Sequence, residues 1–191
     1  VSGVKIGLMV FNSNVSDSTA HGGTEDRNSN GGRIQSDIVS LTDANKVTLN
    51  TQIDAISAST YTPLAETLYE AGLYFKGGAS YFNSGVTYIS PVQYSCQKNY
   101  VIIMTDGDPT RDDGYKPGDS EPSTFDPEAH NHILKTVIGD RDGDGREPGG
   151  ANRVHYIVYG SDMLGTDYLD DVAKYLYDSD LRGDLTGKQN I

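Results

Sequence analysis

The chain has 191 residues, and its 27 acidic against 15 basic residues give a formal net charge of -12. This length suits one well-buried domain, and the negative charge argues against nucleic acid or anionic membrane as a partner and favours bound cations. Hydrophobic residues make up 36% of the chain and 22 residues are glycine, so we expect a modest core and many loops. No apolar run is long enough to predict a membrane span.

The first third of the chain predicts two strands and a helix. Residues 4–11 are apolar at nearly every position, which is typical of a strand buried on both faces. After a polar loop, residues 31–34 predict a short edge strand. Thr42 offers capping chemistry for a helix that follows it, because apolar residues then recur at helical spacing. The positions expected to face the core are Val47, Leu49, Ile53 and Ile56.

A second helix is predicted to begin at Thr62-Pro63 and to end at Gly77-Gly78, because proline suits a first turn and glycine suits a helix end. Its expected buried side is formed by Leu64, Leu68, Ala71 and Phe75. Residues 79–97 predict an exposed insertion, in which 86–89 has strand character.

The stretch 100–110 reads Tyr-Val-Ile-Ile-Met-Thr-Asp-Gly-Asp-Pro-Thr. An apolar run that ends in Asp106 and a turn predicts a buried parallel strand, which would place Asp106 at the carboxyl edge of a sheet. Open α/β sheets bind ligands at that edge. Asp106 is therefore the first candidate site residue.

The last part of the chain predicts a strand over 153–159 and an amphipathic helix over 168–177. The inward positions of that helix are expected to be Leu169, Val172, Ala173 and Leu176. Strands that alternate with helices predict an α/β fold with a largely parallel sheet flanked by helices. We expect a single partial domain over 1–191, an excerpt of a longer chain, with insertions at about 12–32, 79–97 and 111–150.

Thr62 and Asp106 form the first pair of candidate ligands. A hydroxyl at a helix entry and a carboxylate at a strand end are hard oxygen ligands that suit Mg²⁺, Mn²⁺ or Ca²⁺. Residue chemistry alone leaves a second interpretation open, in which Thr62 caps the helix and Asp106 is a turn residue.

The second candidate site is an acidic loop in which carboxylates occupy alternate positions before a glycine. This spacing matches the first half of an EF-hand-like calcium loop. The expected ligands are Asp140, Asp142, Asp144, the backbone carbonyl of Arg146, and Glu147. The twelfth position is Ala151, so the usual bidentate glutamate is missing, and its candidate replacements are Glu147, Asp170 and Asp171. The alternative is a solvated acidic turn, but carboxylates this close repel each other without a cation.

Three weaker signals are also present. Cys96, the only cysteine, is either a small buried thiol or a disulfide partner of a residue outside this sequence. Arg182-Gly183-Asp184 is the tripeptide that integrins read and is a weak ligand-binding candidate. A looser acidic group, expected to be solvated, consists of Asp112, Asp113 and Asp119.

The order of residues 4–11, 62–71 and 100–110 resembles a von Willebrand factor A domain, which has a Rossmann-type sheet. The metal-ion-dependent adhesion site of that family takes a threonine from a helix-leading loop and an aspartate from the following strand end. The resemblance implies that Thr62 and Asp106 hold Mg²⁺ or Ca²⁺. The family's first motif, Asp-x-Ser-x-Ser, is absent from this chain. Its strand would lie between 4–11 and 100–105, so we expect an upstream segment or another chain to complete the sheet.

The acidic loop, the run Leu-Asp-Asp-Val-Ala-Lys-Tyr-Leu-Tyr at 169–177 and the later Gly-Lys-Gln-Asn at 187–190 are similar to the N-terminal domain of the type IV pilus tip-associated (PilY) family. The resemblance covers most of 4–191. It implies a secreted, calcium-dependent and non-enzymatic protein at the cell surface, pilus tip or outer membrane. The implied partners are pilus minor subunits, the major pilin, and a surface or host ligand.

Two alternatives to an adhesion and pilus assembly module stay open. One is a structural pilus- or fibre-associated subunit whose metal site is vestigial because the first motif is missing. The other is a metal-dependent hydrolase that uses Asp106 and Asp108 to hold catalytic ions, although no general base is recognisable.

Overall fold

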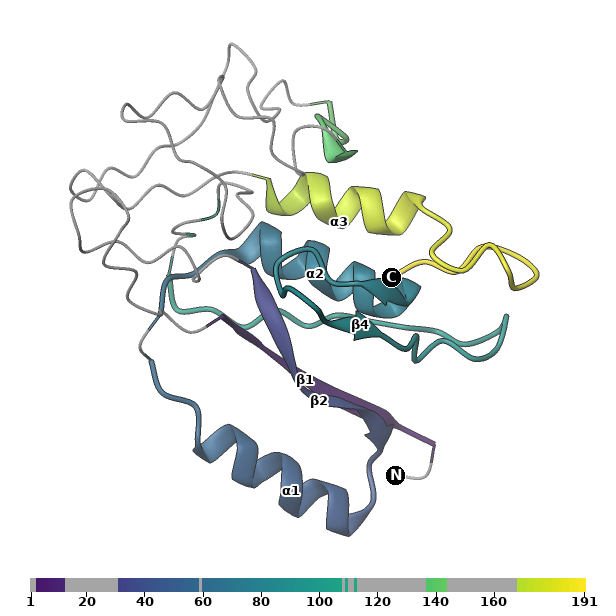
Figure 1. Ribbon diagram of the computed structural model, residues 1–191. Helices are drawn as coiled ribbons and strands as arrows, with labels where there is room; N and C mark the ends of the chain where they lie inside the picture. The colour runs from purple at the N-terminus through teal and green to yellow at the C-terminus, as the bar shows by residue number, and fades with distance from the viewer. Residues whose placement is uncertain are drawn as a thin grey trace, which may run out of the picture.

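The computed structural model describes residues 3–12, 31–58, 60–107, 109, 112, 137–143 and 168–191. Within these ranges it has three helices and two antiparallel two-stranded sheets (Figure 1). The strands are β1 (Lys5–Phe11), β2 (Gly32–Ser40), β3 (Gly78–Ala79) and β4 (Thr87–Tyr88). The helices are α1 (Asp43–Asp54), α2 (Leu64–Lys76) and α3 (Leu169–Asp178).

The larger sheet is the pair β1 and β2, which runs from Lys5 opposite Ser40 to Phe11 opposite Gly32, with irregular register around Leu8. Gly32 lies where this pair approaches α2, since an added Cβ would come within 2.6 Å of the Thr67 methyl group. The start of β2 can therefore approach α2 only with a glycine at this position. The smaller sheet pairs β3 with β4, which confirms the predicted strand character of 86–89.

The predicted largely parallel sheet is wrong. Both sheets of the described residues are antiparallel, and residues 100–105 belong to neither of them. Ile102 is 86% exposed and Met104 is 88% exposed, and β1 is only partly covered. An apolar run becomes a buried strand only where other elements cover its faces and pair with its edges. Among the described residues no strand pairs with 100–105, and within that run Val101 packs against the core.

Helix α1 begins where the sequence predicts, because Thr42 caps it by accepting a hydrogen bond from the Asn45 amide at 3.2 Å. The expected inward face of this helix is wrong. None of its residues is buried, and Val47 is 67% exposed. Helical spacing correctly indicated the helix, but the covering layer that would bury its apolar side is not supplied by the described residues.

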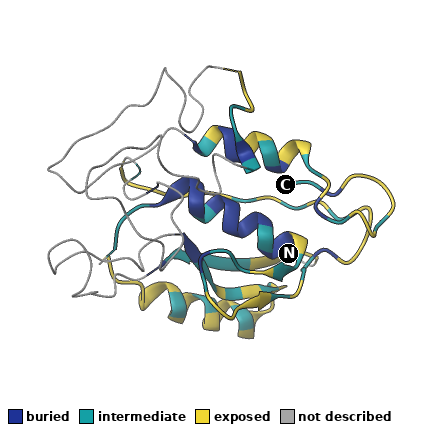
Figure 2. Ribbon diagram, turned by 45° about the horizontal axis from the view of Figure 1, so that its top comes forward, coloured by how far each residue is buried: buried dark blue, intermediate teal, exposed yellow. Residues whose placement is uncertain are grey.

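Helix α2 forms the centre of the core, and it is dark blue along most of its length in Figure 2. Its predicted inward residues are all buried, namely Leu64, Leu68, Ala71 and Phe75. The helix ends at Gly77, whose φ of 77° favours glycine, as predicted. Segment 79–97 packs against this core through Phe82 and Val92, so it is only partly the exposed insertion expected from the sequence.

Helix α3 packs on α2, as Figure 1 shows. Val172 and Leu176 are buried as predicted, whereas Ala173 is exposed. The contact is close at Gly72, because a Cβ added there would overlap the Cδ2 methyl of Leu176. The glycine in the middle of α2 therefore sets the distance between the two helices.

Gly72→Val is expected to destabilise the protein by about 2–3 kcal/mol, because the added side chain overpacks the contact with Leu176. Urea denaturation measures the change. Gly183→Val is the matched control, because an added Cβ there finds only an Asp180 carboxylate oxygen at 3.8 Å. Equal stability of the two variants would contradict the close helix packing.

Candidate metal centre

Three aspartates from two separate segments come together beside α3. Asp140 and Asp142 lie in the loop 137–143, and Asp171 lies in the first turn of α3. One carboxylate oxygen from each lies within 4.8 Å of the others. Three hard oxygen ligands at this separation can hold a divalent cation. We call this group the aspartate triad.

Hydrogen bonds to the backbone position the triad. The Oδ1 of Asp171 accepts from the Arg141 amide at 2.5 Å and, more weakly, from the Asp142 amide at 3.4 Å. The Gly143 amide donates to Asp140 Oδ1 at 2.7 Å, and Gly143 has a φ of 82°, which favours glycine. Asp140 therefore stabilises the turn of the loop at Gly143, and Asp171 fixes the loop to α3.

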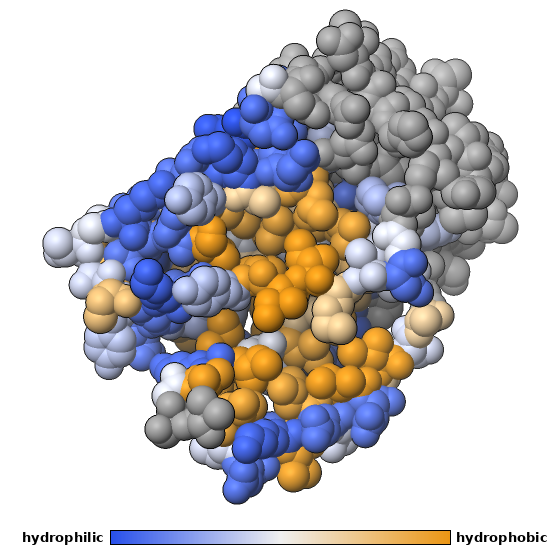
Figure 3. Space-filling model, turned by 180° about the vertical axis from the view of Figure 1, so that it is seen from behind, coloured by the Kyte–Doolittle hydropathy of each residue, from blue (hydrophilic) through white to orange (hydrophobic). Residues whose placement is uncertain are grey.

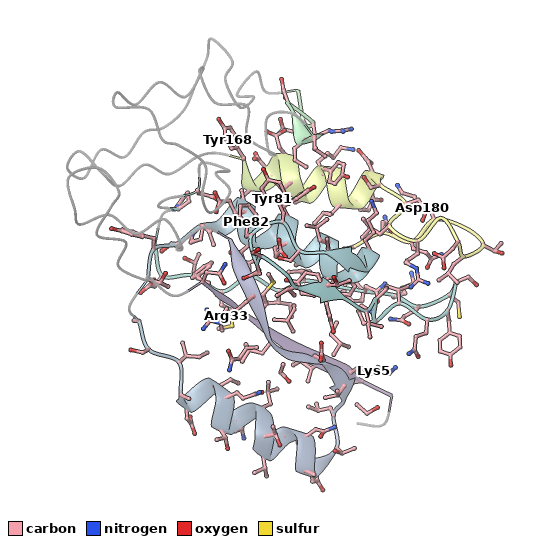
Figure 4. The ribbon with its side chains drawn as sticks, in the orientation of Figure 1. Lys5, Arg33, Tyr81, Phe82, Tyr168 and Asp180 are labelled. Carbon is pink, nitrogen blue, oxygen red and sulfur yellow. The ribbon has the colours of Figure 1, made fainter. Side chains whose placement is uncertain are left out.

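The side chain of Arg141 fixes the same loop from the other direction. Its guanidinium donates to the carbonyls of Ile138 at 2.7 Å and Val137 at 3.2 Å, and it lies 5.2 Å from the ring centroid of Tyr175 on α3. Ile138 itself is buried in the core. Arg141 therefore stabilises the loop through contacts that do not involve the carboxylates of the triad. Tyr168, labelled in Figure 4, lies directly before α3 and is also buried.

The triad is electrostatically unfavourable without a cation. Burial raises the pKa of Asp171, while the backbone hydrogen bonds from Arg141 and Asp142 lower it, and the charges of Asp170 and Asp142 raise it further. The net direction is upward from the ordinary aspartate value of 3.8. A bound cation would offset the repulsion and favour the ionised form.

Proton competition gives this site a predicted pH dependence. Metal binding requires ionised carboxylates, so affinity for Ca²⁺ is expected to fall as pH is lowered from about 7 to about 4, beginning above the ordinary pKa of aspartate. The stability of the metal-free protein is expected to change with pH in the opposite direction. Folding raises the pKa of Asp171, so the contribution of Asp171 to the free energy of unfolding increases as pH falls through its folded-state pKa. Calcium titrations and urea denaturation across this range measure the two trends. A pH-independent calcium affinity would contradict the assignment of Asp171.

Of the predicted calcium loop, the structure shows only a group of aspartates that could hold a metal ion. Asp140 and Asp142 lie in the triad, and Asp171, one of the three proposed replacements for the missing glutamate, is the residue that joins them. Asp144, Arg146 and Glu147 lie outside the described residues.

The predicted adhesion-site pair stays a prediction. Thr62 is partly buried directly before α2, and Asp106 is exposed in the bend after 100–105. Asp106 is not a member of the aspartate triad, which is the one group of three acidic, histidine or cysteine ligands in the part of the chain that the structure describes.

The role of Asp112 was missed, and the expectation that it is solvated is wrong. Asp112 is buried, and its two oxygens accept hydrogen bonds from the amides of Ala65 at 2.8 Å and Glu66 at 2.9 Å. It therefore satisfies the first turn of α2, where a negative charge is favourable. The residue lies 47 positions after Ala65, so no local capping pattern could have indicated it. Asp113 and Asp119 lie outside the described residues.

The tripeptide Arg182-Gly183-Asp184 folds on itself. The Arg182 guanidinium donates to both oxygens of Asp184 at 2.7 Å, and its third nitrogen, Nη1, donates to the Val92 carbonyl. This arrangement orders the tripeptide, and its role as a ligand stays a prediction. Cys96 is exposed, so the buried-thiol interpretation is wrong.

Comparison with protein-family models, with curated proteins and with solved structures finds no significant match. Across the described ranges, no helix combines the length and apolar composition that crossing a bilayer requires.

Proposed function

We propose that this chain is a calcium-stabilised, non-enzymatic module at the cell surface that supports adhesion and type IV pilus assembly. The observation that carries the calcium part is the aspartate triad, in which Asp140 and Asp142 meet the buried Asp171. The pilus part rests on the sequence resemblance. Both arguments meet in α3, because the most specific run of the resemblance, 169–177, contains Asp171.

The proposed ion at the triad is Ca²⁺, and its role is structural. Calcium accepts six to eight oxygen ligands in flexible arrangements that mix carboxylates and main-chain carbonyls, whereas Mg²⁺ demands a near-ideal octahedron and retains its water. The carboxylates of loop 137–143 and α3 repel each other, so the ion would hold the loop on the helix. We expect a dissociation constant of roughly 0.1–1 mM, the range of extracellular calcium modules.

The proposed adhesive contact uses a second ion, Mg²⁺ or Ca²⁺, at Thr62 and Asp106. An ion with a free coordination position would accept a carboxylate or another oxygen from a pilus minor subunit, the major pilin or a surface ligand. This proposal rests on the order of the two residues in the sequence and on the exposure of Asp106, which leaves its carboxylate accessible. Its implied location is extracellular, at the pilus tip or outer membrane.

Two measurements test the parts separately. Isothermal titration with Ca²⁺ and Mg²⁺ on the chain and on the Asp140→Asn/Asp142→Asn variant should show a calcium site at the triad that the variant loses. Surface binding of purified pilin and minor pilus subunits, with and without calcium, should show calcium-dependent capture that Asp106→Asn weakens about tenfold. If the chain binds calcium but captures neither pilin nor minor pilus subunits, the metal centre would stand and the pilus role would be wrong. An absence of calcium binding would overturn the metal centre.

A further inference from the structure

The exposed side of α3 carries positive charge in a chain that is acidic overall. Three exposed cations lie there, namely Arg141 from the loop 137–143, Lys174 from the helix, and Lys188 from the segment that follows the helix. We call these three residues the cationic face. Figure 3 shows hydrophilic side chains gathered along the edge of the molecule that α3 and the segments beside it form in Figure 1.

The cationic face has more positive charges than carboxylates to neutralise them. The Lys174 ammonium pairs with Asp178. Neither Arg141 nor Lys188 forms an ion pair with a residue that the structure describes. The hydrogen bond from Lys174 lowers the pKa of Asp178, and the charges of all three cations lower it further. Three cations therefore share one carboxylate, and the other acidic residues of α3 lie in its first turn.

Two tyrosines of α3 hold these cations beside the helix. The Arg141 guanidinium lies 5.2 Å from the ring centroid of Tyr175. The ammonium groups of Lys188 and Lys174 lie 5.3 Å and 5.9 Å from the ring centroid of Tyr177. An aromatic ring attracts a cation without neutralising its charge. The cations are therefore positioned and remain able to attract an anion.

The backbone on the far side of Lys188 is fixed as well. Gln189 is buried, and its backbone amide donates to Asp180 Oδ1 at 3.1 Å. The Asn190 side chain donates to the Tyr177 carbonyl at 2.7 Å, which joins this segment to the end of α3. Groups that are already in place lose less conformational entropy when a ligand binds.

We propose that the cationic face binds an acidic segment of a partner polypeptide, in which aspartate or glutamate recurs at alternate positions. The ammonium groups of Lys174 and Lys188 lie no farther apart than the sum of their distances to the Tyr177 centroid. Side chains on one side of an extended peptide recur about every 7 Å, so two carboxylates of one peptide can reach both lysines. Arg141 uses Nε and Nη2 for the loop, which leaves Nη1 for a third carboxylate. Clusters of cations recognise acidic motifs in this way.

Charge and ring contacts favour an acidic polypeptide over other anionic partners. A sugar acid typically adds stacking of its ring on an uncovered aromatic face, whereas Tyr175 and Tyr177 already contact cations. A second copy of the chain is opposed by the net charge of -12 on each copy. The same charge repels an acidic partner from most of the surface and directs it to the cationic face. The face contains no residue of the aspartate triad, so this proposal is independent of the metal centre and of the pilus role.

The probe for this face is an eight-residue peptide of alternating glutamate and serine. It is titrated into the isotope-labelled chain in calcium-free buffer, so the result does not depend on the metal centre. Amide chemical shifts at 174–178 and 188 should move with a dissociation constant of roughly 0.1–1 mM at low salt, and added salt should weaken binding. The same peptide with glutamine in place of glutamate should bind at least about tenfold more weakly.

Charge variants locate the site. Lys174→Gln/Lys188→Gln removes two exposed cations from the face and should weaken peptide binding about tenfold. Lys5→Gln/Lys46→Gln is the matched control, because it changes the net charge equally but lies on β1 and α1, and it should weaken binding less than about twofold.

A third variant should change binding in the opposite direction. Asp178→Asn removes the carboxylate that competes with the peptide and should strengthen binding about threefold. Asp54→Asn, an exposed aspartate at the end of α1, is its control and should leave binding unchanged.

Several results would overturn the proposal. They are equal binding of the glutamine peptide, equal binding by the two lysine variants, weaker binding by Asp178→Asn, and no shifts at 174–178 and 188. Tighter binding of a galacturonic acid oligomer at the same amides would overturn it in favour of a polysaccharide. A dimer in sedimentation experiments that Lys174→Gln/Lys188→Gln abolishes would overturn it in favour of a second copy.

Discussion

Asp171→Asn is expected to abolish the gain in stability that calcium gives the protein. The substitution keeps the shape of the side chain and one oxygen for the Arg141 amide, but it removes the buried charge that completes the aspartate triad. A ligand at 100 times its dissociation constant stabilises the native state by about 2.7 kcal/mol. Urea denaturation of both proteins with saturating calcium and with a chelator measures the difference.

Asp170→Asn is the matched control for this experiment. Asp170 is the neighbouring acidic residue, it is exposed, and it is not a member of the triad. The variant should retain most of the calcium-dependent gain. If Asp170→Asn lost the gain and Asp171→Asn kept it, Asp170 and not Asp171 would be the ligand that replaces the missing glutamate. If calcium gave the unmodified protein no gain, the metal centre would be wrong.

Glu70→Ala is expected to destabilise the protein by about 3–5 kcal/mol. Glu70 lies in the middle of α2 and is fully buried. Its carboxylate accepts hydrogen bonds from the hydroxyls of Ser80 and Tyr88 and from the amides of Tyr81 and Phe82. Removing the carboxylate leaves four buried or partly buried donors without this acceptor and opens a cavity. Thermal and urea denaturation measure the loss.

Two milder variants separate the lost hydrogen bonds from the lost volume. Tyr88→Phe removes one donor to Glu70, at 2.7 Å, and should cost about 1 kcal/mol. Glu70→Gln keeps the volume and one acceptor oxygen, so its cost should fall between the costs of the other two variants. A loss below about 1 kcal/mol for Glu70→Ala would show that the segment 79–97 does not depend on this carboxylate.

The helices were predictable from sequence because their signals are local. Thr42 caps α1, Gly77 ends α2, and the spacing of Leu64, Leu68 and Ala71 identifies the buried side of α2. Each of these signals acts within a few residues, so a single sequence contains it. The position of β1 followed from its apolar run for the same reason.

Burial and strand pairing were not predictable because they depend on segments distant in the chain. The runs at 4–11 and 100–105 are both mostly apolar, yet the first forms an antiparallel pair with β2 and the second joins neither sheet. The predicted burial of the apolar face of α1 is wrong for the same reason. Apolar character indicates that a residue needs cover, but it does not identify the element that supplies it.

The metal centre was predictable where its spacing is regular. Asp140 and Asp142 occupy alternate positions, as in a calcium loop. Asp171 lies on a helix about 30 positions later, and the sequence offered it as one of three candidate ligands. Asp112 carries no such pattern at all. A carboxylate that caps a helix from a distant loop looks, in sequence, like any acidic loop residue.

The distance of Asp112 from α2 also constrains the order of folding. The first amides of α2 receive their acceptor from a residue 47 positions downstream, so this end of the helix gains its cap only after a long loop has closed. We therefore expect the C-terminal turns of α2, which end at Gly77, to form early and the first turn to become fixed late. The core helix would then be completed from its C-terminal end towards its N-terminal end, and amide exchange at Ala65 and Glu66 would report the last step.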